Sequence, residues 1–426
     1  MLKKTPLKHG KRSRFRRSFI SFFQKVDFLP YVALIFPPCG MFCQRFLNGI
    51  ATTLLVLLLV QHGVRRQHLS AAWSLIPRSV LYSLVALLLW MGIVLFWCVD
   101  LPVNAQKTVS VVFYFVAGSF ISSSLMQSSQ KKKTIRYFTY GVLGGLCLLA
   151  TELSSYGWLY KKVFTPDLAT LDFMYSSQAT IPGIIIWPLA AHLLRQKHYV
   201  LLCVIAALCT TIFKNAGNES ARMAFLVGSA VFVITLLMRK YFLYFLRLAI
   251  FTYVAFSPVL ITKYDLILKR YSTPMIERLF CASERLNIWR LCIYRILNHP
   301  FQGYGVGSIR SNEFLSISKD HGDHYTSWVL TQWVHHTHNA ALEIWEDLGI
   351  IGILIMLYLL DYLFRSLIKA PLPLLMRASF CASICAALSV TLTCFSFWHG
   401  WWIFLFCLMA PIVHAFVVTA RAEESP

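Results

Sequence analysis

Residues 401–419 read WWIFLFCLMAPIVHAFVVT, a stretch that contains no Asp, Glu, Lys or Arg. A helix needs ~20 mostly apolar residues to cross the hydrocarbon core of a bilayer, so this stretch predicts a membrane span. Breaking the chain at its charged and Pro/Asn-rich segments gives about twelve such spans. They are residues 28–44, 47–63, 79–98, 107–126, 137–153, 179–194, 199–213, 223–238, 246–262, 342–361, 378–397 and 401–419. The sequence therefore predicts an all-α polytopic membrane protein.

The composition of the whole chain supports this prediction. Of the 426 residues, 57% are hydrophobic and only 14% are charged, and the mean hydropathy is +0.61. A water-soluble protein averages about 25% charged residues. The composition thus excludes a string of soluble domains.

The net charge of +22 is distributed in a pattern that predicts orientation. Loops on the cytoplasmic side of a membrane protein carry an excess of Lys and Arg. With the N-terminus inside, every cytoplasmic loop is basic, through Arg65, Arg66, Lys131, Lys132, Lys133, Arg136, Arg195, Lys197, Arg239, Lys240, Arg365, Lys369 and Arg377. Both termini are therefore predicted to be cytoplasmic. The remaining cations favour membrane phospholipids and lipid-linked phosphates, not nucleic acid, as partners.

One long hydrophilic segment, residues 263–340, is predicted to lie on the other side, and a loop of this length crosses the membrane regardless of its charge. It contains nine Lys/Arg, six acids and six of the 13 histidines. We expect this loop to be the catalytic part, because function concentrates in loops held by a rigid scaffold. The predicted organisation is a basic N-terminal tail (1–27), helices 1–9 (28–262), the loop (263–340), helices 10–12 (341–419) and a C-terminal tail (420–426).

Three groups of residues could carry chemistry. The first is the stretch from Lys214 to Arg222, KNAGNESAR, between two predicted spans. Asn218 or Ser220 is expected to cap the next helix, which places Arg222 in its first turn, where the helix end and the guanidinium both favour a phosphate. The alternative is that Arg222 only extends to the membrane interface.

The second group lies inside the loop, where SERLNIWRLCIYRIL at residues 283–297 predicts one helix ended by Asn298-His299-Pro300 and a glycine-rich turn. Arg285 and Trp289 are four residues apart and share a face, an arrangement suited to a phosphate–sugar ligand. The alternative is an amphipathic helix lying on the membrane. The glycines Gly303, Gly305 and Gly307 favour a turn over a nucleotide site.

The third group is His335-His336-Thr337-His338-Asn339, which runs into the tenth span. On a helix, His338 tops a stripe formed by Leu342, Trp345, Gly349 and Gly352. A histidine above such a groove can act as a general base near neutral pH, and the small residues allow a helix or lipid tail to approach closely. A metal site built with Asp323 and His324 is the competing interpretation, but the spacing fits no standard zinc pattern.

The residues of these groups resemble the motifs of the O-antigen ligase family, which joins O-antigen to the lipid A core of lipopolysaccharide. His338-Asn339, nine residues, Gly349, two residues and Gly352 are similar to the family's histidine motif, and its place at the end of the large loop also matches. Arg285, Trp289, Asn298, Pro300, Gly303 and Gly305 resemble the family's second motif. Arg222 is similar to the arginine of its first motif, although Ala221 separates Ser220 from Arg222 here.

The resemblance implies a metal-independent inverting glycosyltransferase without a cofactor. Its donor would be O-antigen on undecaprenyl diphosphate and its acceptor a sugar hydroxyl of the lipid A core, at the periplasmic face of the bacterial inner membrane. Catalytic roles fall to His338 as base and to Arg285 and Arg222 as partners of the diphosphate. We expect substrate contacts from Trp289, Arg290, Asn339, Lys214 and His336. An O-antigen polymerase or another transferase of the same superfamily is the nearest alternative, and a lipid transporter is a third.

Overall fold

The computed structural model describes residues 26–65, 75–164, 178–271, 282–311 and 336–424. These residues are almost entirely helical and contain no strand, which confirms the all-α prediction. The first seven helices are α2 (Leu29–Phe42), α3 (Phe46–Arg65), α5 (Arg78–Val94), α6 (Leu101–Met126), α7 (Lys131–Ser154), α8 (Trp158–Phe164) and α10 (Thr180–Arg195). They are followed by α11 (Tyr199–Asn215), α12 (Glu219–Met238), α13 (Lys240–Tyr271), α15 (Ala282–Asn298), the 3₁₀ helix η1 (Ser308–Arg310), α18 (Ala340–Lys369), α19 (Leu374–Thr391) and α20 (Gly400–Glu424).

Each of the predicted spans coincides with one of these helices, but the helices differ in their capacity to cross a membrane. Within the described residues, six are long and apolar enough to do so, namely α6, α12, α13 to Leu266, α18, α19 and α20 to Glu423. A seventh candidate is the pair α7 and α8, which meet at a 90° bend. The other five are α2, α3 to His62, α5, α10 and α11, which are apolar but only 10–17 residues long. A polytopic membrane protein is thus confirmed, whereas twelve complete spans remain a prediction.

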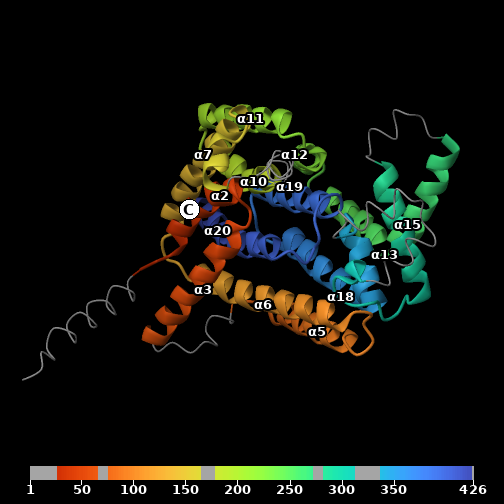
Figure 1. The fold of residues 1–426 in the computed structure, drawn as a ribbon. Helices are drawn as coiled ribbons and strands as arrows, with labels where there is room; N and C mark the ends of the chain where they lie inside the picture. The colour runs from red at the N-terminus through yellow and green to blue at the C-terminus, as the bar shows by residue number, and fades with distance from the viewer. Residues whose placement is uncertain (1–25, 66–74, 165–177, 272–281, 312–335, 425–426) are drawn as a thin grey trace, which may run out of the picture.

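The helices pack around two main apolar cores. The larger apolar core joins α2, α3, α6, α7, α10, α11, α12, α19 and α20. A second core joins α5, α13 and α18 and includes Val306 and Trp398 from the segments between helices. In Figure 1, α15 lies beside α13. An ion pair from Arg290 to Asp265 links the two helices. α13 continues to Tyr271, so the predicted loop 263–340 begins as helix.

α13 contains a kink whose free carbonyl is used to fasten α18. Phe256 departs from helical geometry two residues before Pro258. Proline has no backbone N–H, so the carbonyl of Val254 loses its partner within the helix. The indole of Trp345 on α18 donates to this carbonyl at 3.0 Å. The kink therefore provides a hydrogen bond between two candidate membrane spans, α13 and α18.

α18 is interrupted at Gly349, where the backbone adopts φ 62° and ψ −163°. The interruption frees three carbonyls, and all three find donors outside the helix. Glu346 and Asp347 accept from the amides of Tyr304 and Gly305, both at 2.9 Å. Leu348 accepts from the indole of Trp90 at 2.9 Å. The amide of Ile350 in turn donates to the carbonyl of Pro300 at 2.9 Å. The break is thus built around the turn that follows α15.

This finding corrects part of the sequence interpretation. The close approach expected at Gly349 does occur, but its partner is the 300–305 turn, since a Cβ on Gly349 would lie 2.4 Å from the carbonyl oxygen of Phe301. His338 precedes α18, whose N-cap is Asn339, so the histidine is not part of a helical stripe. The predicted glycine-rich turn itself is confirmed, because Gly303, Gly305 and Gly307 all have positive φ.

We expect Gly349→Ala to destabilise the protein by roughly 2–4 kcal/mol, because alanine is strained at this φ and its Cβ would collide with backbone that cannot move away. Gly144→Ala is the matched control, since a Cβ on Gly144 in α7 meets nothing within 4 Å. Thermal unfolding in detergent measures both variants. If the two variants shifted the unfolding midpoint equally, the helix break at Gly349 would not require glycine.

Candidate active site

A cavity of about 870 Å³ lies where the ends of many helices meet. Its wall comes from the α2–α3 junction, the start of α6, the α11–α12 junction, the start of α15, η1, the segment before α18 and the α19–α20 connection. In the predicted topology each of these segments follows an odd-numbered span. All of them therefore belong to the face that the charge pattern predicts as periplasmic.

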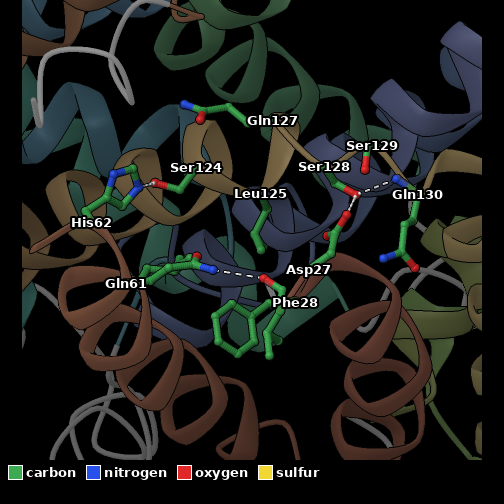
Figure 2. Close-up of a pocket in the computed structure, with 12 residues that line it drawn as sticks. Asp27, Phe28, Gln61, His62, Ser124, Leu125, Gln127, Ser128, Ser129 and Gln130 are labelled. Carbon is green, nitrogen blue, oxygen red and sulfur yellow. Dashed lines mark hydrogen bonds between the residues drawn. The ribbon is translucent and has the colours of Figure 1, made fainter. Parts of the chain in front are cut away.

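A smaller pocket of about 180 Å³ lies at the opposite end of α6 (Figure 2). Here Ser128 donates to Asp27 at 2.7 Å, and His62 and Ser124 are hydrogen-bonded at 3.2 Å. Lys107 in the large cavity and Ser124 in the small pocket belong to the same helix, roughly 25 Å apart at ~1.5 Å per residue. The two pockets thus lie at opposite ends of α6. The described residues that line the small one include no lysine or arginine.

His338 lines the large cavity from a strained position at the tip of a tight turn. Its φ of 52° is unusual for a residue with a side chain. The turn is closed by Thr337, whose hydroxyl donates to the carbonyl of Asn339 at 2.8 Å and accepts from the amide of Asn339 at 3.1 Å. Strain of this kind costs about 1–3 kcal/mol and persists only where the surroundings enforce it. The position of the imidazole is therefore imposed by its neighbours.

Two residues chosen from the sequence as substrate ligands are among these neighbours. Asn339 caps α18 through its amide oxygen, which accepts from Ala341 and Leu342, and its amide nitrogen donates to the hydroxyl of Tyr253 at 2.8 Å. Trp289 donates from its indole to the carbonyl of Thr337 at 2.9 Å. Neither lines the cavity. Both residues hold the turn that carries His338, so their contribution to the site is to position it.

The α19–α20 connection forms the wall beside His338 and is fastened by buried carboxylates of α18. Glu343 accepts from the hydroxyl of Ser396 at 2.6 Å and from the amide of Phe397 at 2.8 Å. Asp347 accepts from the indole of Trp398 at 2.7 Å. His336 donates to the carbonyl of Cys394 in the same connection at 2.7 Å, and its ring lies 4.1 Å from that of His338. His336 also lines the cavity, and the substrate contact expected of it stays a prediction.

Burial lowers the pKa of His338 from 6.5 to about 2, with further lowering from the nearby His336 and Arg285 and an opposing effect from the carbonyl of Cys394. A lowered pKa favours the neutral imidazole, and only the neutral form can accept a proton. The site therefore presents a base that is already unprotonated at neutral pH. Because it is a weak base in the empty cavity, an anion bound close by would strengthen it.

We expect kcat/KM to stay level as the pH falls from about 8 to about 5, because His338 in the free enzyme is not protonated in that range. An ordinary solvated histidine would instead lose its basic form below pH 6.5 and reduce the rate about tenfold per further pH unit. Steady-state rates over this range measure the effect. An acid limb centred near 6.5 would contradict a buried, neutral base at this position.

Arg285 is the predicted arginine that the structure brings to the base. It lies in the first turn of α15, lines the same cavity as His338 and lies close enough to lower the pKa of that histidine. Among the described residues that line the cavity, the single carboxylate is that of Glu219, which is exposed. Arg285 can therefore offer its guanidinium to an anionic ligand.

Arg222 and Lys214 do not line this cavity, and their roles in the reaction stay predictions. Asn218 caps α12, as predicted, but the guanidinium of Arg222 is directed to the end of α11. It donates to the carbonyls of Phe213 at 2.8 Å and Lys214 at 3.3 Å, and it pairs with Glu219 at 3.5 Å. Arg222 thus satisfies the C-terminal carbonyls of the preceding helix.

Arg290 is also placed away from the cavity. Its guanidinium binds both carboxylate oxygens of Asp265 on α13, at 3.0 and 2.5 Å, and donates to Asn287 at 2.7 Å. The predicted helix 283–297 is confirmed as α15, and Arg290 fastens it to α13. The substrate contact expected of Arg290 stays a prediction. Asp323, His324 and His335, which the metal alternative requires, lie outside the described residues.

The structure adds cavity residues that the sequence did not single out. Three are cations, Arg45, Lys107 and Arg310, each from a different segment of the chain. Four are aromatic, Tyr114, Phe395, Trp398 and Trp401, and His399 lies with its ring 5.7 Å from that of His336. Among these residues, only Arg310 was noted in the sequence, as one of the cations of the long loop. Counted over the described residues that line it, the cavity offers four cations against the single acid Glu219, together with aromatic faces suited to sugars.

Residues 199–357 match the family model described as O-antigen ligase. This segment of the chain is similar to the O-antigen ligases. The matched segment runs from α11 to the first half of α18 and so contains both Arg285 and His338. The match confirms the resemblance indicated by the three motifs.

Curated relatives with this likeness are candidate polysaccharide ligases of three Rickettsia species. The chain is 23% identical to the protein of Rickettsia conorii over 74% of each chain. It is 22% identical to that of Rickettsia felis over 87% of this chain and 93% of the relative. For Rickettsia prowazekii the identity is 22% over 71% of this chain and 72% of the relative. The likeness to ligases thus extends well beyond the matched O-antigen ligase segment.

Proposed function

We propose that the protein is an inverting glycosyltransferase that moves O-antigen from undecaprenyl diphosphate to a sugar hydroxyl of the lipid A core. The observation that carries this proposal is the pairing of His338 with Arg285 in one cavity. The first is a histidine held neutral, and the second is a cation that can meet a phosphate. The kinship with O-antigen ligases supports the choice of a glycan as substrate.

The proposed reaction is a single displacement. The acceptor hydroxyl attacks the anomeric carbon of the donor sugar while the bond from that carbon to the diphosphate oxygen breaks. His338 takes the proton of the hydroxyl, and the electron pair leaves with the diphosphate beside Arg285. Attack from the side opposite the leaving group inverts the anomeric carbon. The product is the glycosylated core together with undecaprenyl diphosphate.

The chemistry required of the protein is modest, because a diphosphate is already a good leaving group. Its developing charge has to be stabilised, and a positioned guanidinium does this in a cavity of low dielectric constant. The residues of the wall supply a base, cations and aromatic surfaces, so we propose that the reaction proceeds without a metal ion. The proposed location is the periplasmic face of the inner membrane, with both termini in the cytoplasm. The charge pattern of the loops supports this orientation.

The nearest alternative is an O-antigen polymerase, which would use the same donor with another acceptor. Deleting the gene in its host separates the two. Loss of a ligase leaves bare lipid A core and accumulates lipid-linked polymer, whereas loss of a polymerase leaves core capped with a single repeat. We expect the first pattern, restored by the wild-type gene. The second pattern, or unchanged lipopolysaccharide, would overturn the ligase assignment.

A further inference from the structure

A further cavity, of about 390 Å³, lies at the other end of the molecule from the candidate active site. Its wall comes from the start of α7, the end of α10, the start of α11 and the end of α20. The active-site cavity meets α11 and α20 at their opposite ends. The charge pattern predicts that all four segments of this wall are cytoplasmic. The cavity is therefore separate from the proposed chemistry.

The basic run at the start of α7 divides between this cavity and other contacts. Lys131 donates to the carbonyl of Met126 at 2.7 Å, and the ammonium of Lys133 lies 5.2 Å from the ring centre of Tyr31. Lys132 and Arg136 instead line the cavity. They are four residues apart and so share one face of the helix. Orientation in the membrane requires cations on this side, but it does not require that two of them meet in one cavity.

The carboxylate in this wall is engaged by other groups. Glu423 pairs with Arg195 at 3.3 Å and accepts from the side-chain amide of Gln196 at 3.0 Å. Within the described residues, Lys132 and Arg136 have no carboxylate within 4.0 Å. Like charges four residues apart on a helix repel each other, and an anion bound beside both relieves this repulsion. The cavity is thus suited to a phosphate, which offers several acceptor oxygens to an ammonium and a guanidinium.

The rest of the wall indicates what carries the phosphate. Leu193 and Leu201 line the cavity together with Tyr140, whose side chain is 55% exposed. Tyr140 follows Arg136 by four residues, so it lies roughly 6 Å farther along α7, on the side of the membrane interior. Tyrosine is enriched at this depth, where the aqueous and apolar regions meet. A free phosphate would leave this apolar surface uncovered, whereas a phospholipid covers it with its glycerol and the first part of its acyl chains.

We propose that this cavity binds the headgroup of an anionic phospholipid of the cytoplasmic leaflet. Lys132 and Arg136 hold the phosphate, and Tyr140, Leu193 and Leu201 contact the glycerol and acyl chains. The lipid bridges α7, α10, α11 and α20, which all belong to the larger apolar core. Because it binds the folded protein, it stabilises the packing of these four helices. The inference does not depend on the proposed transfer reaction.

The test measures lipid binding to the full-length protein in detergent, by native mass spectrometry and by thermal unfolding. The probes are phosphatidylglycerol, phosphatidylcholine with the same acyl chains, and inorganic phosphate. We expect phosphatidylglycerol to bind and to raise the unfolding midpoint, and the other two probes to bind at least roughly tenfold more weakly. The double variant Lys132→Gln/Arg136→Gln should weaken phosphatidylglycerol binding roughly tenfold or more, because it removes two charge-assisted contacts. Lys132→Arg should keep most of the affinity, since it keeps the charge.

The matched control is Lys240→Gln/Lys369→Gln, which removes the same charge from the same predicted face. Both lysines are exposed and lie outside the cavity, so this variant should bind phosphatidylglycerol as wild type does. Equal weakening in the two double variants would overturn the site in favour of general attraction to a basic surface. Equal binding of phosphatidylcholine and phosphatidylglycerol would overturn the requirement for an anion. Inorganic phosphate that bound as tightly as phosphatidylglycerol would overturn the assignment to a lipid.

Discussion

His338→Ala is expected to lower transfer by about 10²–10⁴-fold, the range that a positioned general base contributes. The cavity offers His336 and His399 nearby, but His336 is committed to the carbonyl of Cys394 through its ring nitrogen. His336 therefore does not replace the lost base directly. The measurement is the initial rate of transfer from a lipid-linked donor by the purified variant.

His198→Ala is the matched control, since His198 is exposed at the start of α11 and its side chain makes no capping hydrogen bond. We expect full activity from it. Thermal unfolding should report similar midpoints for both variants, so that a loss at His338 is a loss of chemistry. Full-length lipopolysaccharide made by a stably inserted His338→Ala protein would contradict the base assignment.

Arg285→Gln is expected to reduce kcat by about 10²–10³-fold, as the loss of a group that stabilises developing charge does. The KM for the donor should rise as well, because the same guanidinium meets the diphosphate before the reaction. Rates measured at varied donor concentration separate the two effects. Removal of this charge also raises the pKa of His338 toward its ordinary value, so the acid limb of the pH profile should move upward.

Arg222→Gln is the informative comparison, because both arginines belong to motifs that suggested phosphate binding. Arg222 instead holds the carbonyls of Phe213 and Lys214 at the end of α11. We expect this variant to keep most of its activity and to unfold at a lower temperature. An activity loss as large as that of Arg285→Gln, with unchanged stability, would restore Arg222 to the site.

The sequence predicted the helices well because membrane spans follow from continuous hydropathy, which is a local property. It also selected Arg285, His336 and His338, which the structure brings to one cavity, since their motifs have fixed spacings. Arg222 shows the limit of this reasoning. Its place in the first turn of α12 was correct, but a backbone position does not specify the direction of a long side chain. Its guanidinium is turned away by the free carbonyls of the preceding helix.

The remaining cavity residues had no local signal. Lys107 is an isolated cation at the start of an apolar helix, and the wall at 394–401 lies more than fifty residues beyond the histidine that it faces. They meet only because α18 breaks at Gly349 and admits the glycine-rich turn. The sequence contains glycines both at the break and in the turn. It does not show that the turn packs against the break. Contacts between distant segments depend on tertiary packing, which periodicity does not encode.

The most direct test of the proposed reaction is transfer by the purified protein from undecaprenyl-diphosphate-linked O-antigen to purified lipid A core, with and without a chelator. We expect glycosylated core with an inverted anomeric linkage in wild-type reactions, unaffected by the chelator, and none with His338→Ala. Retention of the anomeric configuration, or transfer that stops when the chelator is added, would contradict a direct displacement driven by His338 and Arg285.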